Sequence, residues 1–132
     1  MHFKKFDEAN RIRCEAPDGF NHTLGSWSMS DWLVAVLGEL GEAANIVKKL
    51  NRVRDGIPGN KETPEELRAK LENELADADI YLSLLYQAAG IDRETAILET
   101  FNRKSKEIGY PGARTASELN ARDLVDQLRD EW

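Results

Sequence analysis

The chain has 132 residues, of which 41% are apolar and 32% are charged. This length allows one domain with a core and is too short for two comfortable ones. The net charge of −6 argues against a nucleic-acid polymer as partner, because phosphate backbones are bound through clustered lysine and arginine side chains. We therefore expect a single domain over residues 1–132 that binds no nucleic-acid polymer.

Neither a membrane nor a secretory pathway is indicated. The longest uninterrupted apolar run, Trp32 to Leu37, is far shorter than the roughly 20 residues of a membrane-spanning helix. The N-terminal stretch MHFKKFDEAN has no apolar segment of the kind found in secretory signals. Cys14 is the single cysteine, which excludes an internal disulfide and agrees with a reducing compartment. We expect a cytoplasmic protein without a membrane partner.

The first half of the chain predicts two helices and an aromatic loop between them. The first helix is expected over about residues 3–13, and residues 16–30 form a loop rich in glycine, serine and aromatic residues. Ser30 is expected to cap a long helix over residues 31–54, whose first turn carries an acid that suits the helix dipole. The stretch DGIPGN then ends this helix, because glycine and proline do not continue a helix cheaply.

The second half predicts two further helices and a short last one. The segment Thr63-Pro64-Glu65-Glu66 combines a threonine cap, a proline at the first helical position and a glutamate three residues after the cap. This third helix is expected to end at about Ala89. A fourth helix is expected from its cap, Asp92, to about Glu107, and a short amphipathic helix capped by Ser117 follows. No segment alternates like a strand, so the predicted fold class is all-α.

The second and third helices each combine an apolar seam with acids. One seam has alternating spacings of four and three and consists of Trp32, Val36, Glu39, Ala43, Ile46 and Leu50. The other has the same spacings and consists of Leu67, Leu71, Glu74, Ala78, Tyr81 and Leu85. This is the pattern of a packed helix pair, in which Trp32 is expected to be a core residue. Each seam contains one glutamate, and a second acid, Glu42 or Asp77, follows three residues later.

An antiparallel hairpin would bring these four acids to one level. The midpoint of positions 42 and 74 is 58, and the midpoint of 39 and 77 is also 58, inside the predicted turn. Four carboxylates so close together repel one another unless a cation compensates them. Oxygen ligands without histidine or cysteine favour Mg²⁺ or Mn²⁺ over zinc. Taken singly, each acidic pair would more often be a solvated surface turn, as most pairs of acids three residues apart are; it is the two pairs together, on matching seams, that favour a metal site.

At these residues the sequence resembles the MazG-like, all-α nucleoside triphosphate pyrophosphatases. The family's mark is E-x-x-E on one helix and E-x-x-D on the next, here in LGELGEAANIVKKL and ENELADADIYLSLLYQAAGID, and FNRKSKEIGYP also matches. The match covers about residues 30–111, the expected core of the domain. The resemblance implies a four-helix-bundle-like module that forms homodimers or homotetramers. It also implies Mg²⁺-dependent hydrolysis of a (deoxy)nucleoside triphosphate to the monophosphate and pyrophosphate.

The resemblance also implies roles for single residues. The four metal ligands and catalytic residues would be Glu39, Glu42, Glu74 and Asp77, with one glutamate orienting or deprotonating the attacking water. Tyr81 would lie near the substrate, and Asn102 would touch its phosphates.

Two departures from the family concern base selection. The dCTP pyrophosphatase branch has a tryptophan that stacks on the base seven residues after the second glutamate, and Lys49 occupies that position here. The branch's Tyr-Pro pair follows the asparagine by four residues, but Tyr110-Pro111 follows Asn102 by eight. Base preference therefore cannot be copied from that branch.

Further residues are candidates for substrate contact on chemical grounds. Arg103 and Lys106 lie within a turn of Asn102 and could bind the leaving pyrophosphate. Lys49 is another candidate, with the alternative that it complements the dipole at a helix C-terminus. In the loop, His22 and Trp27 offer stacking surfaces for a base.

The leading expectation is a Mg²⁺-dependent nucleotide pyrophosphohydrolase for housekeeping of the nucleotide pool. The alternative is a metal- or nucleotide-binding helical regulatory dimer without turnover. A di-iron carboxylate protein is less expected, because such bundles use Glu-x-x-His motifs. Apolar residues off the seam, such as Val34 and Leu37, favour self-association in either case.

Overall fold

The computed structural model describes residues 2–115, and within this range its regular elements are all helical. They follow one another along the chain as α1 (Phe3–Glu15), the short 3-10 helix η1 (Leu24–Ser26), α2 (Met29–Arg54), α3 (Pro64–Ala88) and α4 (Arg93–Glu107). The predicted all-α class is thereby confirmed. The helix predicted after Ser117 lies outside the described residues.

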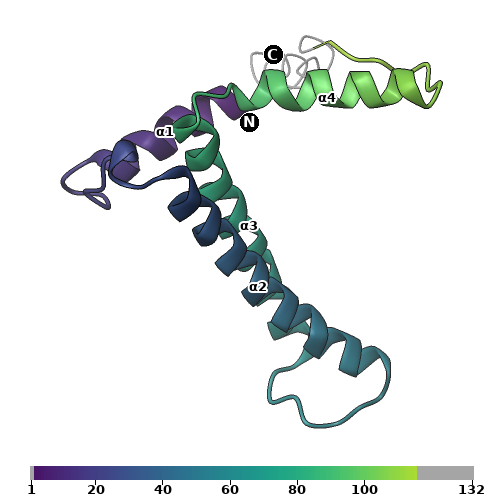
Figure 1. Ribbon diagram of the computed structural model, residues 1–132. Helices are drawn as coiled ribbons and strands as arrows, with labels where there is room; N and C mark the ends of the chain where they lie inside the picture. The colour runs from purple at the N-terminus through teal and green to yellow at the C-terminus, as the bar shows by residue number, and fades with distance from the viewer. Residues whose placement is uncertain (1, 116–132) are drawn as a thin grey trace, which may run out of the picture.

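The two longest helices, α2 and α3, form an antiparallel hairpin whose connecting loop lies at its far end (Figure 1). At the opposite end, α1 lies across the hairpin and α4 runs outward from it. All members of the two predicted seams are buried or half-buried, Glu39 and Glu74 included. The two helices of the hairpin therefore pack along the faces that the spacing predicts. Helix α4 lies away from most of the length of the hairpin.

Two capping boxes begin the hairpin helices. The Thr63 hydroxyl accepts a hydrogen bond from the Glu66 backbone, and the Glu66 carboxylate accepts one from the Thr63 backbone, as predicted. For α2 the predicted cap, Ser30, is wrong, because Ser28 makes the corresponding pair of bonds with Asp31. A capping box needs an acid three residues after the cap, and Asp31 stands in that relation to Ser28. The helix consequently starts two residues earlier than predicted.

A small core closes the end of the hairpin beneath α1. Its buried members are Cys14, Leu24, Trp32 and Leu84. Trp32 is only 2% exposed, and its indole nitrogen donates to the Leu24 carbonyl at 3.1 Å, so its predicted core role is confirmed. The aromatic loop is tied back onto α1, because the His22 backbone nitrogen donates to the Cys14 carbonyl at 2.8 Å. This core holds the loop beside α2 and α3.

Polar contacts fasten α1 to α3 and α4. The Asn10 side-chain amide donates to the Ile80 carbonyl at 2.9 Å. The Asp7 carboxylate accepts hydrogen bonds from Ser83 and Arg93, both at 2.7 Å. The Arg93 side chain is 4% exposed and lies over the Phe3 ring. A buried charge is tolerated only when it is paired, so this contact determines where α4 leaves the hairpin.

The outward face of α2 is apolar. Its exposed large apolar residues include Leu33, Val34, Leu37, Leu40 and Val47, and Val34 is 66% exposed. So many exposed large apolar side chains on one helix are typical of an interaction surface. Among the described residues, no helix has the length and apolar character needed to cross a membrane.

Candidate functional site

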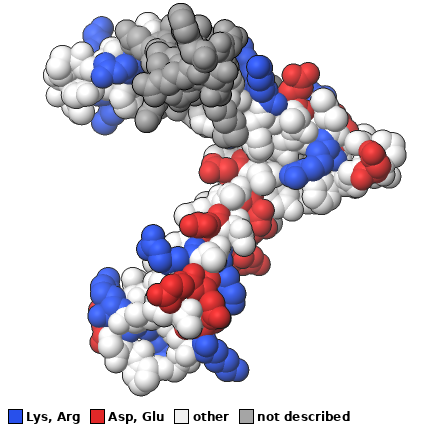
Figure 2. All heavy atoms as spheres, turned by 180° about the vertical axis from the view of Figure 1, so that it is seen from behind, with Lys and Arg blue, Asp and Glu red and all other residues white. Residues whose placement is uncertain are grey.

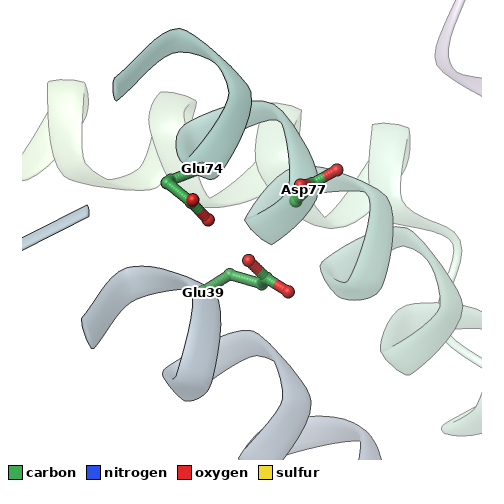
Figure 3. Close-up of side chains that lie close together, drawn as sticks. All are labelled: Glu39, Glu74 and Asp77. Carbon is green, nitrogen blue, oxygen red and sulfur yellow. The ribbon is translucent and has the colours of Figure 1, made fainter. Parts of the chain in front are cut away.

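The centre of the candidate site is a group of carboxylates halfway along the hairpin. Glu39 comes from α2, and Glu74 and Asp77 come from successive turns of α3 (Figure 3). One oxygen from each of the three carboxylates lies within 4.8 Å of the others. Figure 3 shows Glu39 and Glu74 directed toward each other between the helices. The seam spacing produces this arrangement, because each glutamate occupies a position that faces the partner helix.

Glu42 is the fourth acid at this level. Hydrogen bonding to Glu74 raises the pKa of the Glu42 carboxyl, and the negative charges of Glu74 and Asp77, together with burial, raise it further. A raised carboxyl pKa beside other carboxylates is the result of like charges that cannot all ionise without cost. Glu42 thus interacts with two of the three grouped acids but is not itself a member of that group, and a divalent cation would relieve the repulsion.

This donor set suits a hard cation. The group contains carboxylate oxygens only, which is the ligand type that Mg²⁺ and Mn²⁺ prefer in proteins. Two carboxylates on each helix, three residues apart, lie on one face within a turn of each other. Figure 2 shows acidic side chains along the middle of the hairpin, and lysine and arginine side chains nearer its tip.

An aromatic cavity of about 330 Å³ adjoins the acids on the side of α1. It is lined by Glu39 and Asp77 and by Asn10, His22, Trp27 and Tyr81, among others. The His22 and Trp27 rings meet edge to face with centroids 4.6 Å apart, and Trp27 lies 4.6 Å from Trp32. Rings arranged in this way present flat apolar surface to a planar ligand. Three predicted substrate residues, His22, Trp27 and Tyr81, are thus brought beside two of the acids.

A lysine cavity of about 390 Å³ lies on the other side of the acids. Its lining residues are Glu42, Asn45, Ile46, Lys49, Glu62, Lys70 and Glu74. The predicted substrate residue Lys49 is therefore near the acids, and its ammonium pairs with Glu62 at 2.8 Å. The cavity places positive charge one to two helical turns from the carboxylates.

The three candidates on α4 are not brought to the acids of their own chain. Asn102 is bonded to the backbone of Arg114, donating to its carbonyl at 2.7 Å and accepting from its nitrogen at 2.9 Å. Arg103 lies 3.9 Å from Glu107, and Lys106 is exposed. Neither cavity is lined by any of these three residues. The physical reason is the outward course of α4 (Figure 1).

Sequence reasoning missed several residues that line the two cavities. Asn10 reaches the aromatic cavity from α1, whose position depends on tertiary contacts that no spacing reveals. Lys70 could have been found from the sequence. In the hairpin centred on position 58, position 67 lies opposite Lys49, and Lys70 follows position 67 by one turn of the same helix. Glu62 had no signal, since it lies in the loop before the Thr63 cap.

The arrangement combines three chemical capacities. Carboxylates can hold a divalent cation, rings can stack on a planar group, and ammonium groups can bind an anion. A ligand with both a planar group and an anionic chain could use all three. Comparisons of the chain with protein-family models, with curated proteins and with solved structures find no match.

Proposed function

We propose that the chain is a Mg²⁺-dependent nucleoside triphosphate pyrophosphohydrolase, with Mn²⁺ as a possible substitute. The observation that carries the proposal is the meeting of Glu39, Glu74 and Asp77, with Glu42 bonded to Glu74, beside a cavity lined by aromatic rings. The resemblance of the acidic motifs to the MazG-like family supports the same conclusion. The proposed role is housekeeping of the nucleotide pool in the cytoplasm.

The ligands of the cation would be Glu39, Glu42, Glu74 and Asp77. When bound, Mg²⁺ supplies charge compensation for acids and phosphates and lowers the pKa of a coordinated water. The chain's own contribution is to accept the proton of the attacking water on one of the glutamates. The water oxygen forms a bond to a phosphorus of the α–β anhydride. The bond from that phosphorus to the bridging oxygen breaks, and the products are monophosphate and pyrophosphate.

The aromatic cavity would bind the base. His22 and Trp27 offer ring faces and edges, and Tyr81 lies beside the acids. Stacking binds any planar base and therefore orients the nucleotide without selecting it. Holding the phosphates over the acids in one orientation lowers the entropic part of the barrier.

We further propose that the active protein is a homodimer or homotetramer. The apolar outer face of α2 would be covered by a second copy, which removes its exposed apolar area from water. Because α4 runs outward, Asn102, Arg103 and Lys106 could contact phosphates only at the acids of another copy. Self-association would therefore complete the site as well as bury the face.

The test is a substrate panel. The purified protein is incubated with each common NTP and dNTP and with dUTP, with and without Mg²⁺, and pyrophosphate and monophosphate are assayed. The expected result is Mg²⁺-dependent release of both products in equal amounts, which also identifies the preferred base. Retained Mg²⁺ or nucleotide binding without any hydrolysis would contradict the proposal and favour the alternative, a regulatory helical dimer without turnover.

A further inference from the structure

The four acids lie between two cavities of different character. Glu39 and Asp77 line the aromatic cavity, whereas Glu42 and Glu74 line the lysine cavity. Going along α2 toward the hairpin tip, the aromatic cavity comes first, then the acids, then Lys49. A ligand held at the acids can therefore extend in two directions, and the two directions offer opposite chemistry.

The lysine cavity contains two ammonium groups that share one carboxylate. Lys49 from α2 and Lys70 from α3 both contact the same oxygen of Glu62, at 2.8 and 3.3 Å. The carboxylate is the more enclosed partner, with 18% of its side chain exposed, while the two lysines are 39% and 54% exposed. Glu62 alone is one negative charge against two positive charges, but Glu42 and Glu74 line the same cavity. The cavity therefore offers excess positive charge to an anion only when a divalent cation compensates these acids.

Both lysines keep donors for a ligand. An ammonium group has three N–H donors, and one contact to Glu62 uses only one of them. Hydrogen bonding to Lys49, together with the contact to Lys70, lowers the pKa of Glu62 to about 2, so its carboxylate stays ionised. Glu62 is thus the counter-ion of both ammoniums and competes with an anionic ligand for their remaining donors.

We propose that Lys49 and Lys70 bind the terminal phosphates of the nucleotide, so that the substrate lies along the hairpin with its base toward α1. This inference rests on the proposed function. The leaving pyrophosphate would be the group at the lysines, and the base would occupy the aromatic cavity. Glu42 and Lys49 are seven residues apart, about 10 Å along the helix axis, a gap that a lysine side chain and a phosphate chain bridge together.

Charge and shape both favour this orientation. An aromatic residue at position 49 could stack on a base, but lysine has no ring and strongly favours an anion. The rings in this part of the chain gather instead at the other cavity, where His22, Trp27 and Tyr81 lie. With the terminal phosphates at the lysines, the α-phosphate would lie at the acids and the base would lie in the aromatic cavity.

The experiment measures binding of the two products separately. Titration calorimetry with Mg²⁺ is performed with inorganic pyrophosphate and with each common nucleoside monophosphate, on the wild type and on Lys49→Met, Lys70→Met and Glu62→Gln. Each lysine variant is expected to lose about tenfold in pyrophosphate affinity, the loss of one charge-assisted hydrogen bond, with monophosphate affinity changed by less than about twofold. Glu62→Gln is expected to increase pyrophosphate affinity by about threefold, because two unpaired cations remain.

Lys61→Met is the matched control. Lys61 precedes Glu62, is exposed, lines neither cavity and is in none of the ion pairs recorded among residues 2–115. Lys61→Met removes the same charge as the two lysine variants, from the loop between α2 and α3, and its pyrophosphate affinity is expected to equal that of the wild type. Thermal melting of every variant shows whether a change in binding follows from unfolding.

Three outcomes overturn the inference. One is a loss of monophosphate affinity with pyrophosphate affinity kept, which would place the base at the lysines. Another is a Glu62→Gln variant that weakens pyrophosphate binding as the lysine variants do, which indicates an ion pair that only stabilises the fold. The third is pyrophosphate binding that does not depend on either lysine.

Turnover of the wild type separates this inference from the proposed function. If the wild type hydrolyses a triphosphate but pyrophosphate binds equally well to the lysine variants, the inference is refuted and the proposed function stands. Lysine-dependent pyrophosphate binding without hydrolysis of any triphosphate refutes the proposed function and leaves the anion site standing. Absence of both hydrolysis and pyrophosphate binding refutes both.

Discussion

The α2–α3 hairpin and α4 both carry residues expected at the site, but only the hairpin brings its residues together within one chain. The acids of α2 and α3 meet because two seams and one turn determine the register of an antiparallel pair. The residues of α4 have no such partner, and Asn102 instead bonds to Arg114. Local periodicity therefore places a residue on a face, and only packing decides what that face meets.

The largest expected effect concerns the acids of the hairpin. Glu42→Gln or Asp77→Asn removes a proposed metal ligand, so hydrolysis should fall by a factor of about 10³ or more while helix content is unchanged. Activity assays and circular dichroism check this. Full activity in both variants would contradict the assignment of the four acids as the metal site.

The second prediction tests whether α4 acts on another copy. Asp77→Asn and Asn102→Ala are each expected to be nearly inactive, and a refolded equal mixture should recover about one quarter of wild-type activity. Random mixing makes half of the dimers heterodimers, and each heterodimer has one intact site out of two. No recovery from a mixture that demonstrably forms heterodimers would place Asn102 outside the partner's site.

The third prediction concerns the attachment of α4 to the rest of the fold. Arg93→Met leaves the half-buried Asp7 carboxylate with Ser83 as its remaining side-chain partner among residues 2–115, and the free energy of unfolding should fall by about 3 kcal/mol. Chemical denaturation measures this change. Lys4→Met is the matched control, because its contact to Asp92 is long and exposed, and it should change stability by less than about 0.5 kcal/mol.

A smaller effect tests the start of α2. Ser28→Ala should lower the free energy of unfolding by about 1 kcal/mol, the usual contribution of an N-terminal cap. Ser30→Ala should change it by less than about 0.5 kcal/mol, because Ser30 lies inside the first turn. Equal losses in the two variants would show that the capping box at Ser28 does not form.

The smallest effect is a dependence of stability on pH in the absence of metal. The folded-state pKa of Glu42 is raised, so the protonated form is favoured by folding. Its contribution is fully present below the ordinary carboxyl pKa of 4.5 and is lost as the pH rises through the raised value. Melting of wild type and Glu42→Gln from pH 4 to 7 isolates this contribution, which Mg²⁺ should abolish. Identical profiles for the two proteins would contradict it.

The sequence by itself determined the helices, both seams and the level at which the acids meet. These follow from a 3.6-residue period, caps, helix breakers and a single turn, all of which are local. The wrong cap among the described helices, Ser30, shows the limit of this reasoning, because the prediction did not use the three-residue spacing between Ser28 and Asp31 that forms the capping box.

Only the tertiary structure decided what surrounds the acids. Asn10 lines the aromatic cavity because of the way α1 packs, and Glu62 lines the lysine cavity because of the course of the hairpin loop. Both depend on contacts between residues far apart in sequence. The outward course of α4 was likewise unpredictable, since Arg93 reaches Asp7 across 86 positions. A helix's period sets which face is apolar, but the partner of that face is chosen by the whole fold.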